Sequence, residues 1–270
     1  MSTRFNPARK DEDVNEVAVN PLQDTIRRWI WVVIFASAFA YVESAVVVYL
    51  REIYFAGAFE FPIVAVWENG RHVLDPLILV EMGREAATVV MLAVIGVIAG
   101  SSGLHRICFF MIAFGVWDIF YYVWLRVILG WPDSLMTWDL LFYIPLPWVG
   151  PVITPVLIAA TMATAGSILI YVVEKGYAIH WRRIDWVMEM GCGFLLIVAF
   201  CWDWKNILRV PDGNAYSGIP NPFAWWLFLP AYLFAAVYFA VRVSQTLRTE
   251  RGSRGGRRAA PGKETGFSPR

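Results

Sequence analysis

Ionisable side chains inside long apolar stretches carry most of the chemical information in this sequence. Placing a charged side chain at the centre of a bilayer costs about 2.5–3.5 kcal/mol on insertion scales, so such residues mark a structural pairing or a function. Glu43 is the single ionisable residue in the middle of the first stretch. The next two stretches contain Glu81, Arg84, Glu85, Asp118 and Arg126.

Helix geometry brings three of these carboxylates to similar depths. With a rise of 1.5 Å per residue, Glu43 and Glu85 lie about 10 and 12 Å below the outer ends of their helices, and Asp118 lies about 16 Å below. Asp118 and Arg126 fall on one face of the third helix. We therefore expect Glu43, Glu85 and Asp118 to face one cavity, with Arg84 or Arg126 at its edge.

Grouped carboxylates in a low dielectric cannot all ionise, so one holds a proton or the group binds a cation. Because Glu43 has no base in its own helix, we expect it to be the protonated or cation-binding member. Such a group suits proton or cation binding, a hard metal such as Mg²⁺, Mn²⁺ or Ca²⁺, or acid–base catalysis. The competing interpretation is structural: Arg84 and Arg126 pair with Glu81, Glu85 and Asp118 and only hold the helices together.

The candidate ligand- or cation-binding residues are the members of this group and their polar neighbours. They are Glu43, Glu81, Glu85, Asp118, Arg84, Arg126, Tyr122 and Asp139. The sequence names no catalytic residue, metal or cofactor. The three histidines, His72, His105 and His180, fall in loops or at helix ends, which argues against b-type haem and against the histidine boxes of di-iron membrane enzymes.

The elements that must position these residues are transmembrane helices. The chain has 270 residues, of which 58% are apolar and 17% charged, whereas soluble domains carry roughly 25% charge. A spanning helix needs about 20 mostly apolar residues. Six stretches meet this requirement, at about 29–50, 77–99, 107–129, 150–173, 184–204 and 223–243. The sequence predicts an all-α, six-helix membrane domain over 29–243, between a cytoplasmic segment 1–28 and a basic, disordered tail 244–270.

The distribution of basic residues predicts the orientation of this bundle. Of the 23 Lys and Arg residues, 17 fall in segments on the side of the N-terminus and six on the other side. Cytoplasmic segments retain Lys and Arg, so both termini are expected inside, in a multi-pass protein of the cell (inner or plasma) membrane. The expected partners are membrane lipids and other membrane subunits, and not nucleic acid.

Three outer connections are rich in aromatic residues and proline. In residues 51–76, Asn69-Gly70 separates two apolar runs, which is the pattern of a hairpin turn. Residues 130–150 contain several Trp and Pro residues, and residues 205–222 form the third connection. We expect these segments to cover the outer ends of the helices.

Three classes of function fit these observations. The favoured one is a binding or transport protein with an outward-facing acidic pocket for a cation, a proton or a small or lipidic ligand. The second is a membrane enzyme that uses carboxylates or a metal on a lipid or isoprenoid substrate. The third is an accessory subunit whose acidic residues are structural. The sequence does not distinguish them, and it leaves open whether the protein is an enzyme.

Overall fold

The computed structural model describes most of the chain as a helical bundle with two small β-hairpins. It describes residues 21–54, 66–68, 71–73, 76–144, 146–179, 181–202 and 223–259. The connection predicted at 205–222, much of that at 51–76 and the two ends of the chain lie outside these residues. The covering of the outer helix ends predicted for those segments lies outside the described residues.

Among the described residues, six helices are long and apolar enough to cross a membrane, as the sequence predicts. They are α1 (Pro21–Tyr54), α2 (Pro76–Ala99), α3 (Gly103–Leu129), α4 (Ile153–Glu174), α5 (Arg183–Cys201) and α7 (Trp225–Ala259). The first and last helices extend beyond their apolar runs. In particular, α7 continues to Ala259, so the first part of the segment expected to be a disordered tail is helical.

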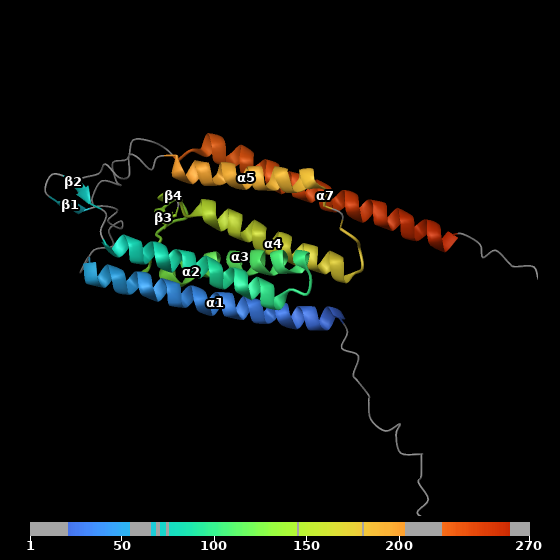
Figure 1. Cartoon of the computed structure of the whole chain (residues 1–270), viewed down its shortest axis with the longest axis horizontal. Coiled ribbons are helices and arrows are strands. Elements are labelled where there is room, and N and C mark those ends of the chain that lie inside the picture. The colour runs from blue at the N-terminus through green and yellow to red at the C-terminus, as the bar shows by residue number, and fades with distance from the viewer. Residues whose placement is uncertain are drawn as a thin grey trace, which may run out of the picture.

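Helix α3 lies at the centre of one group of helices, where it packs against α1, α2 and α4. Helices α5 and α7 form a second pair that lies beside α4 (Figure 1). The helices alternate in direction, so the start of α1 and the end of α7 lie at one end of the bundle, and the strands lie at the other (Figure 1). We refer to these as the terminal end and the hairpin end.

Two glycines allow α3 and α4 to approach closely. A Cβ atom on Gly115 would lie 2.3 Å from the carbonyl oxygen of Ala159, and one on Gly166 would lie 2.7 Å from that of Cys108. Small residues at helix contacts let the backbones meet in this way. The close contact holds the face of α3 that follows Gly115, including Asp118, inside the bundle.

Two antiparallel hairpins modify the all-α prediction. Strands β1 (Val66–Glu68) and β2 (Arg71–Val73) pair with Glu68 opposite Arg71, which confirms the hairpin predicted at Asn69-Gly70. Strands β3 (Trp138–Phe142) and β4 (Trp148–Pro151) pair in the connection from α3 to α4, where we predicted only an outer cap. Proline and tryptophan hide the alternating pattern of such short strands, so the second hairpin has no clear signal in the sequence.

Candidate functional site

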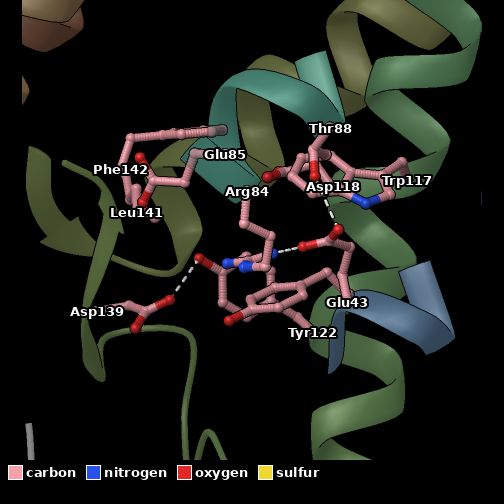
Figure 2. Close-up of a pocket in the computed structure, with 11 residues that line it drawn as sticks. Glu43, Arg84, Glu85, Thr88, Trp117, Asp118, Tyr122, Asp139, Leu141 and Phe142 are labelled. Atoms are coloured by element: carbon pink, nitrogen blue, oxygen red, sulfur yellow. Dashed lines mark hydrogen bonds and ion pairs between the residues drawn. The ribbon is translucent and has the colours of Figure 1, made fainter. Parts of the chain in front are cut away.

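Four carboxylates surround a small cavity beneath the β3–β4 hairpin (Figure 2). Helix α1 contributes Glu43, α2 contributes Glu85, α3 contributes Asp118 and strand β3 contributes Asp139. All four residues are at most 8% exposed. The remaining lining residues are Arg84, Thr88, Trp117, Tyr121, Tyr122, Leu141 and Phe142. The structure thus brings the three carboxylates singled out in the sequence, Glu43, Glu85 and Asp118, to one cavity.

Glu43 is held by two neighbours on α2. The Thr88 hydroxyl donates a hydrogen bond of 2.7 Å to Oε1 of Glu43, and the Arg84 guanidinium forms an ion pair with Oε2 (Figure 2). Arg84 also pairs with Glu81, three residues earlier on the same helix. The expectation for Glu43 considered only the lack of a base in its own helix, and the neighbouring helix supplies an arginine.

Glu85 is bound by main-chain groups of the β3–β4 connection. The amide of Tyr143 donates to both carboxylate oxygens of Glu85, at 3.1 Å to Oε1 and 2.8 Å to Oε2. This contact joins α2 to the hairpin that covers the cavity. Of the arginine pairs that the structural interpretation offered, the described contacts include Arg84–Glu81, whereas Glu85 accepts from a main-chain amide.

Asp118 is the carboxylate of this cavity with the fewest hydrogen-bond donors on its oxygens in the described part of the chain. It is 8% exposed, and among the residues that the structure describes its Oδ2 atom has no hydrogen-bond partner. The indole Nε1 of the adjacent Trp117 is likewise buried without a partner in that part of the chain. Both residues line the cavity. The cavity therefore has one hydrogen-bond acceptor, Asp118 Oδ2, and one donor, Trp117 Nε1, without partners among the described residues. Buried water molecules occupy sites with such unsatisfied polar groups.

Tyr122 and Asp139 link the centre of the bundle to the hairpin. The Tyr122 hydroxyl on α3 donates a hydrogen bond of 2.9 Å to Oδ2 of Asp139 on β3 (Figure 2). Both residues are buried, at 6% and 4% exposed. Asp118 and Tyr122 are four residues apart and lie on one face of α3. Asp118, Tyr122 and Asp139 therefore follow one another from the centre of the bundle towards the hairpin end.

Arg126 lies away from this cavity. Its guanidinium donates to the carbonyl oxygens of Gly130 and Pro132, the latter at 2.8 Å, and lies 3.8 Å from Asp133. Gly130 ends α3 in the left-handed conformation, at φ 71°, and a cation at a helix C-terminus stabilises the exposed carbonyls there. Of the two arginines expected at the cavity edge, only Arg84 lines it.

The described residues offer no ready-made metal site, because no three His, Cys, Asp or Glu side chains among them could hold one ion. His105 lies in the first turn of α3, at the terminal end, where its Nδ1 is 2.8 Å from the Ser101 hydroxyl and its Nε2 is 3.7 Å from Glu174. His180 lies outside the described residues, and His72 falls in β2.

A second buried carboxylate network joins α5 to α7. Asp185 is fully buried and accepts hydrogen bonds from the Tyr238 hydroxyl at 2.6 Å, from Arg242 at 3.0 Å and from the Arg182 amide at 2.8 Å. The Arg182 side chain also pairs with Asp185, at 3.3 Å, and the contacts of Arg242 and Tyr238 come from a helix distant in the sequence. With several donors on its oxygens, this carboxylate is structural.

Sequence reasoning missed several parts of the cavity. Thr88 follows Glu81 and Glu85 at helical spacing, which places it on the same helix face. This spacing does not indicate that Thr88 bonds to Glu43. Nothing in the sequence indicated the Tyr143 amide, since every residue type except proline carries a main-chain donor. Leu141 and Phe142 reach the cavity because β3 folds back over it.

Comparison with protein-family models, with curated proteins and with solved structures finds no match for this chain. The class of this protein is therefore defined by its own fold and cavity. It is a mostly helical protein with six helices long and apolar enough to span a membrane, and it has a buried acidic cavity under a hairpin at one end of the bundle.

Proposed function

We propose that this chain is a multi-pass protein of the cell membrane with both termini in the cytoplasm. The excess of Lys and Arg on the side of the termini supports this orientation. The outward faces of the helices support insertion, because large apolar side chains such as Ile98, Met190 and Val127 are 70–74% exposed. The acidic cavity, at the hairpin end, then lies towards the outer side.

In this orientation the acidic cavity binds a proton, and Asp118 is the residue that holds it. The observation that carries the proposal is the excess of buried acid: four carboxylates line the cavity with a single arginine. Glu43 has Arg84, Glu85 has the Tyr143 amide and Asp139 has the Tyr122 hydroxyl. Like charges that share a low-dielectric site do not all ionise, and the proton falls to the carboxylate whose oxygen lacks a donor.

The size of the cavity favours a proton over a larger ligand. Its volume is about 30 Å³, which is enough for a water molecule but far below the several hundred Å³ of a typical ligand pocket. A water between Asp118 and the Trp117 indole would satisfy both and provide a carrier. A lipid or organic solute would require the hairpin to move away.

The cavity is closed towards the terminal end by a packed apolar layer. Leu92, Phe109 and Ile112 lie on α2 and α3 beyond Thr88 and Asp118, and each is at most 1% exposed. Such a layer has no polar group to carry a proton further. We therefore propose that the proton enters and leaves on the outer side, by way of Tyr122 and Asp139, so that the protein responds to external acidity and does not conduct protons.

Infrared spectroscopy of the reconstituted protein tests this assignment. A protonated carboxylic acid has a carbonyl band that is distinct from those of carboxylates and amides. We expect the wild type to show this band at neutral pH and Asp118→Asn to lose it. Glu81→Gln is the matched control, because Glu81 pairs with Arg84 but does not line the cavity, and it should keep the band.

Proton flux into liposomes provides the second measurement. Wild-type protein should show no flux above that of empty liposomes, since the apolar layer closes the cavity. A carboxylic band that survives in Asp118→Asn would refute the assignment to Asp118. Sustained flux that Asp118→Asn abolishes would replace external proton binding with conduction.

A further inference from the structure

A second and larger recess lies at the opposite end of the bundle, between α1 and α2. It is a groove of about 350 Å³, within the range of ligand-binding pockets. Its walls are apolar except at one point: Arg28 is its single charged lining residue. The other lining residues are Trp31, Val32, Phe35, Ile95, Ile98 and Ala99. The acidic cavity contributes nothing to this groove.

The groove opens on the outward surface of the helix pair. Trp31 is 64% exposed and Ile98 is 74% exposed, so both present apolar surface to whatever surrounds the bundle. In the membrane insertion proposed above, these surroundings are lipid. Its lining residues on α1 run from Arg28 to Phe35, and the one at the start of this run is cationic while the others are apolar.

Positive charge is in excess at the cationic end. Arg27 and Arg28 share one counter-ion, Asp24, which leaves one positive charge over. Arg28 also donates a hydrogen bond of 3.3 Å to the Ala99 carbonyl, which holds its guanidinium at the end of α2.

We propose that this groove binds one anionic phospholipid from the leaflet at the terminal end, with an acyl chain along the groove and the phosphate at Arg28. An acyl chain matches the apolar walls, and a phosphate matches a guanidinium whose planar donors are already oriented by the Ala99 carbonyl. In the proposed orientation this leaflet is the cytoplasmic one, which carries the anionic lipids. The proposal rests on membrane insertion and is independent of the proton site.

Lipid retention by the full chain tests the proposal. The protein is reconstituted in mixed phosphatidylcholine and phosphatidylglycerol, extracted in mild detergent, and analysed by native mass spectrometry for retained lipid. We expect wild type to retain one phosphatidylglycerol in preference to phosphatidylcholine. Arg28→Gln should lower this retention about fivefold, the usual effect of one arginine near an anionic surface, and Arg28→Lys should keep most of it.

Arg27→Gln is the matched control. It removes the same charge from the same counter-ion, Asp24, but Arg27 does not line the groove, so retention should fall much less than in Arg28→Gln. Equal losses in Arg27→Gln and Arg28→Gln would overturn the site, because they would indicate general surface charge. Equal retention of the two lipids by the wild type would overturn it as well.

A pair of bulky substitutions tests the apolar part of the groove without touching any charge. Ile98→Trp should fill the groove and lower the retention of either lipid, whereas Val97→Trp, at an exposed position outside the lining, should not. Should Arg28→Gln fail to fold, as judged by size-exclusion chromatography, this pair decides the question. Wild-type retention in Ile98→Trp would refute an acyl chain in the groove.

Discussion

The main-chain amide of Tyr143 donates hydrogen bonds to both carboxylate oxygens of Glu85, at 3.1 and 2.8 Å. This contact crosses from the connection after β3 to the middle of a long helix. A carboxylate accepts such a paired interaction in its ionised form, so Glu85 acts as the anchor that holds the hairpin over the cavity. The neighbouring carboxylate of Asp118 has no comparable donor on Oδ2 among the described residues.

Glu85→Gln should destabilise the hairpin end of the bundle. The carboxamide keeps one oxygen as an acceptor for the Tyr143 amide, but it replaces the other oxygen with an NH2 group. Two donors then face each other, and one buried donor is left unsatisfied, at a cost of about 1–3 kcal/mol. Thermal unfolding in detergent measures the loss. Asp133→Asn, whose side chain is 93% exposed, should unfold like wild type. Equal melting temperatures for the two variants would show that the Glu85 contact does not hold the hairpin.

The Arg84–Glu43 ion pair should be strongly coupled. Arg84→Gln leaves Glu43 buried with only the Thr88 hydroxyl, and removing one partner of a buried pair costs about 3–5 kcal/mol. Glu43→Gln added to Arg84→Gln should recover part of that loss, because no buried charge then remains unpaired. A double-mutant cycle of unfolding free energies measures the coupling. Additive effects of the two substitutions would contradict the pair as described.

Asp185→Asn should weaken the contact between α5 and α7. The substitution leaves Arg242, whose side chain is 18% exposed, without its carboxylate, a loss of at most about 3–5 kcal/mol, the cost for a fully buried pair. Tyr238→Phe removes one hydrogen bond from the same carboxylate and should cost about 1 kcal/mol. Urea or thermal denaturation ranks the two variants. A smaller loss for Asp185→Asn than for Tyr238→Phe would show that Arg242 does not depend on Asp185.

Reporter fusions should reveal both termini on the cytoplasmic side. A reporter active only outside the cytoplasm should be silent when fused after residue 250. The same reporter near Gly213, in a segment outside the described residues, should be active. These expectations follow from the distribution of Lys and Arg. The reverse pattern would place the acidic cavity towards the cytoplasm and would remove the argument for external proton binding.

Local composition was sufficient to predict the six helices and one of the two hairpins. A run of about 20 apolar residues forms a helix in a membrane whatever its neighbours, because the backbone must satisfy its own hydrogen bonds there. Asn69-Gly70 likewise predicts, from two adjacent residues, the pairing of β1 with β2. The β3–β4 hairpin was not predictable in this way, because its short strands form where the hairpin packs on the bundle.

The sequence by itself also placed Glu43, Glu85 and Asp118 at similar depths, because depth depends only on the number of residues from the end of a helix. Only the tertiary structure decided their partners. The rotation and packing of α2 against α1 bring Arg84 to Glu43, while the hairpin brings a main-chain amide to Glu85. Arg126 turns instead to the loop that follows α3. Partner choice depends on contacts between elements distant in the chain, and no spacing within a single helix records them.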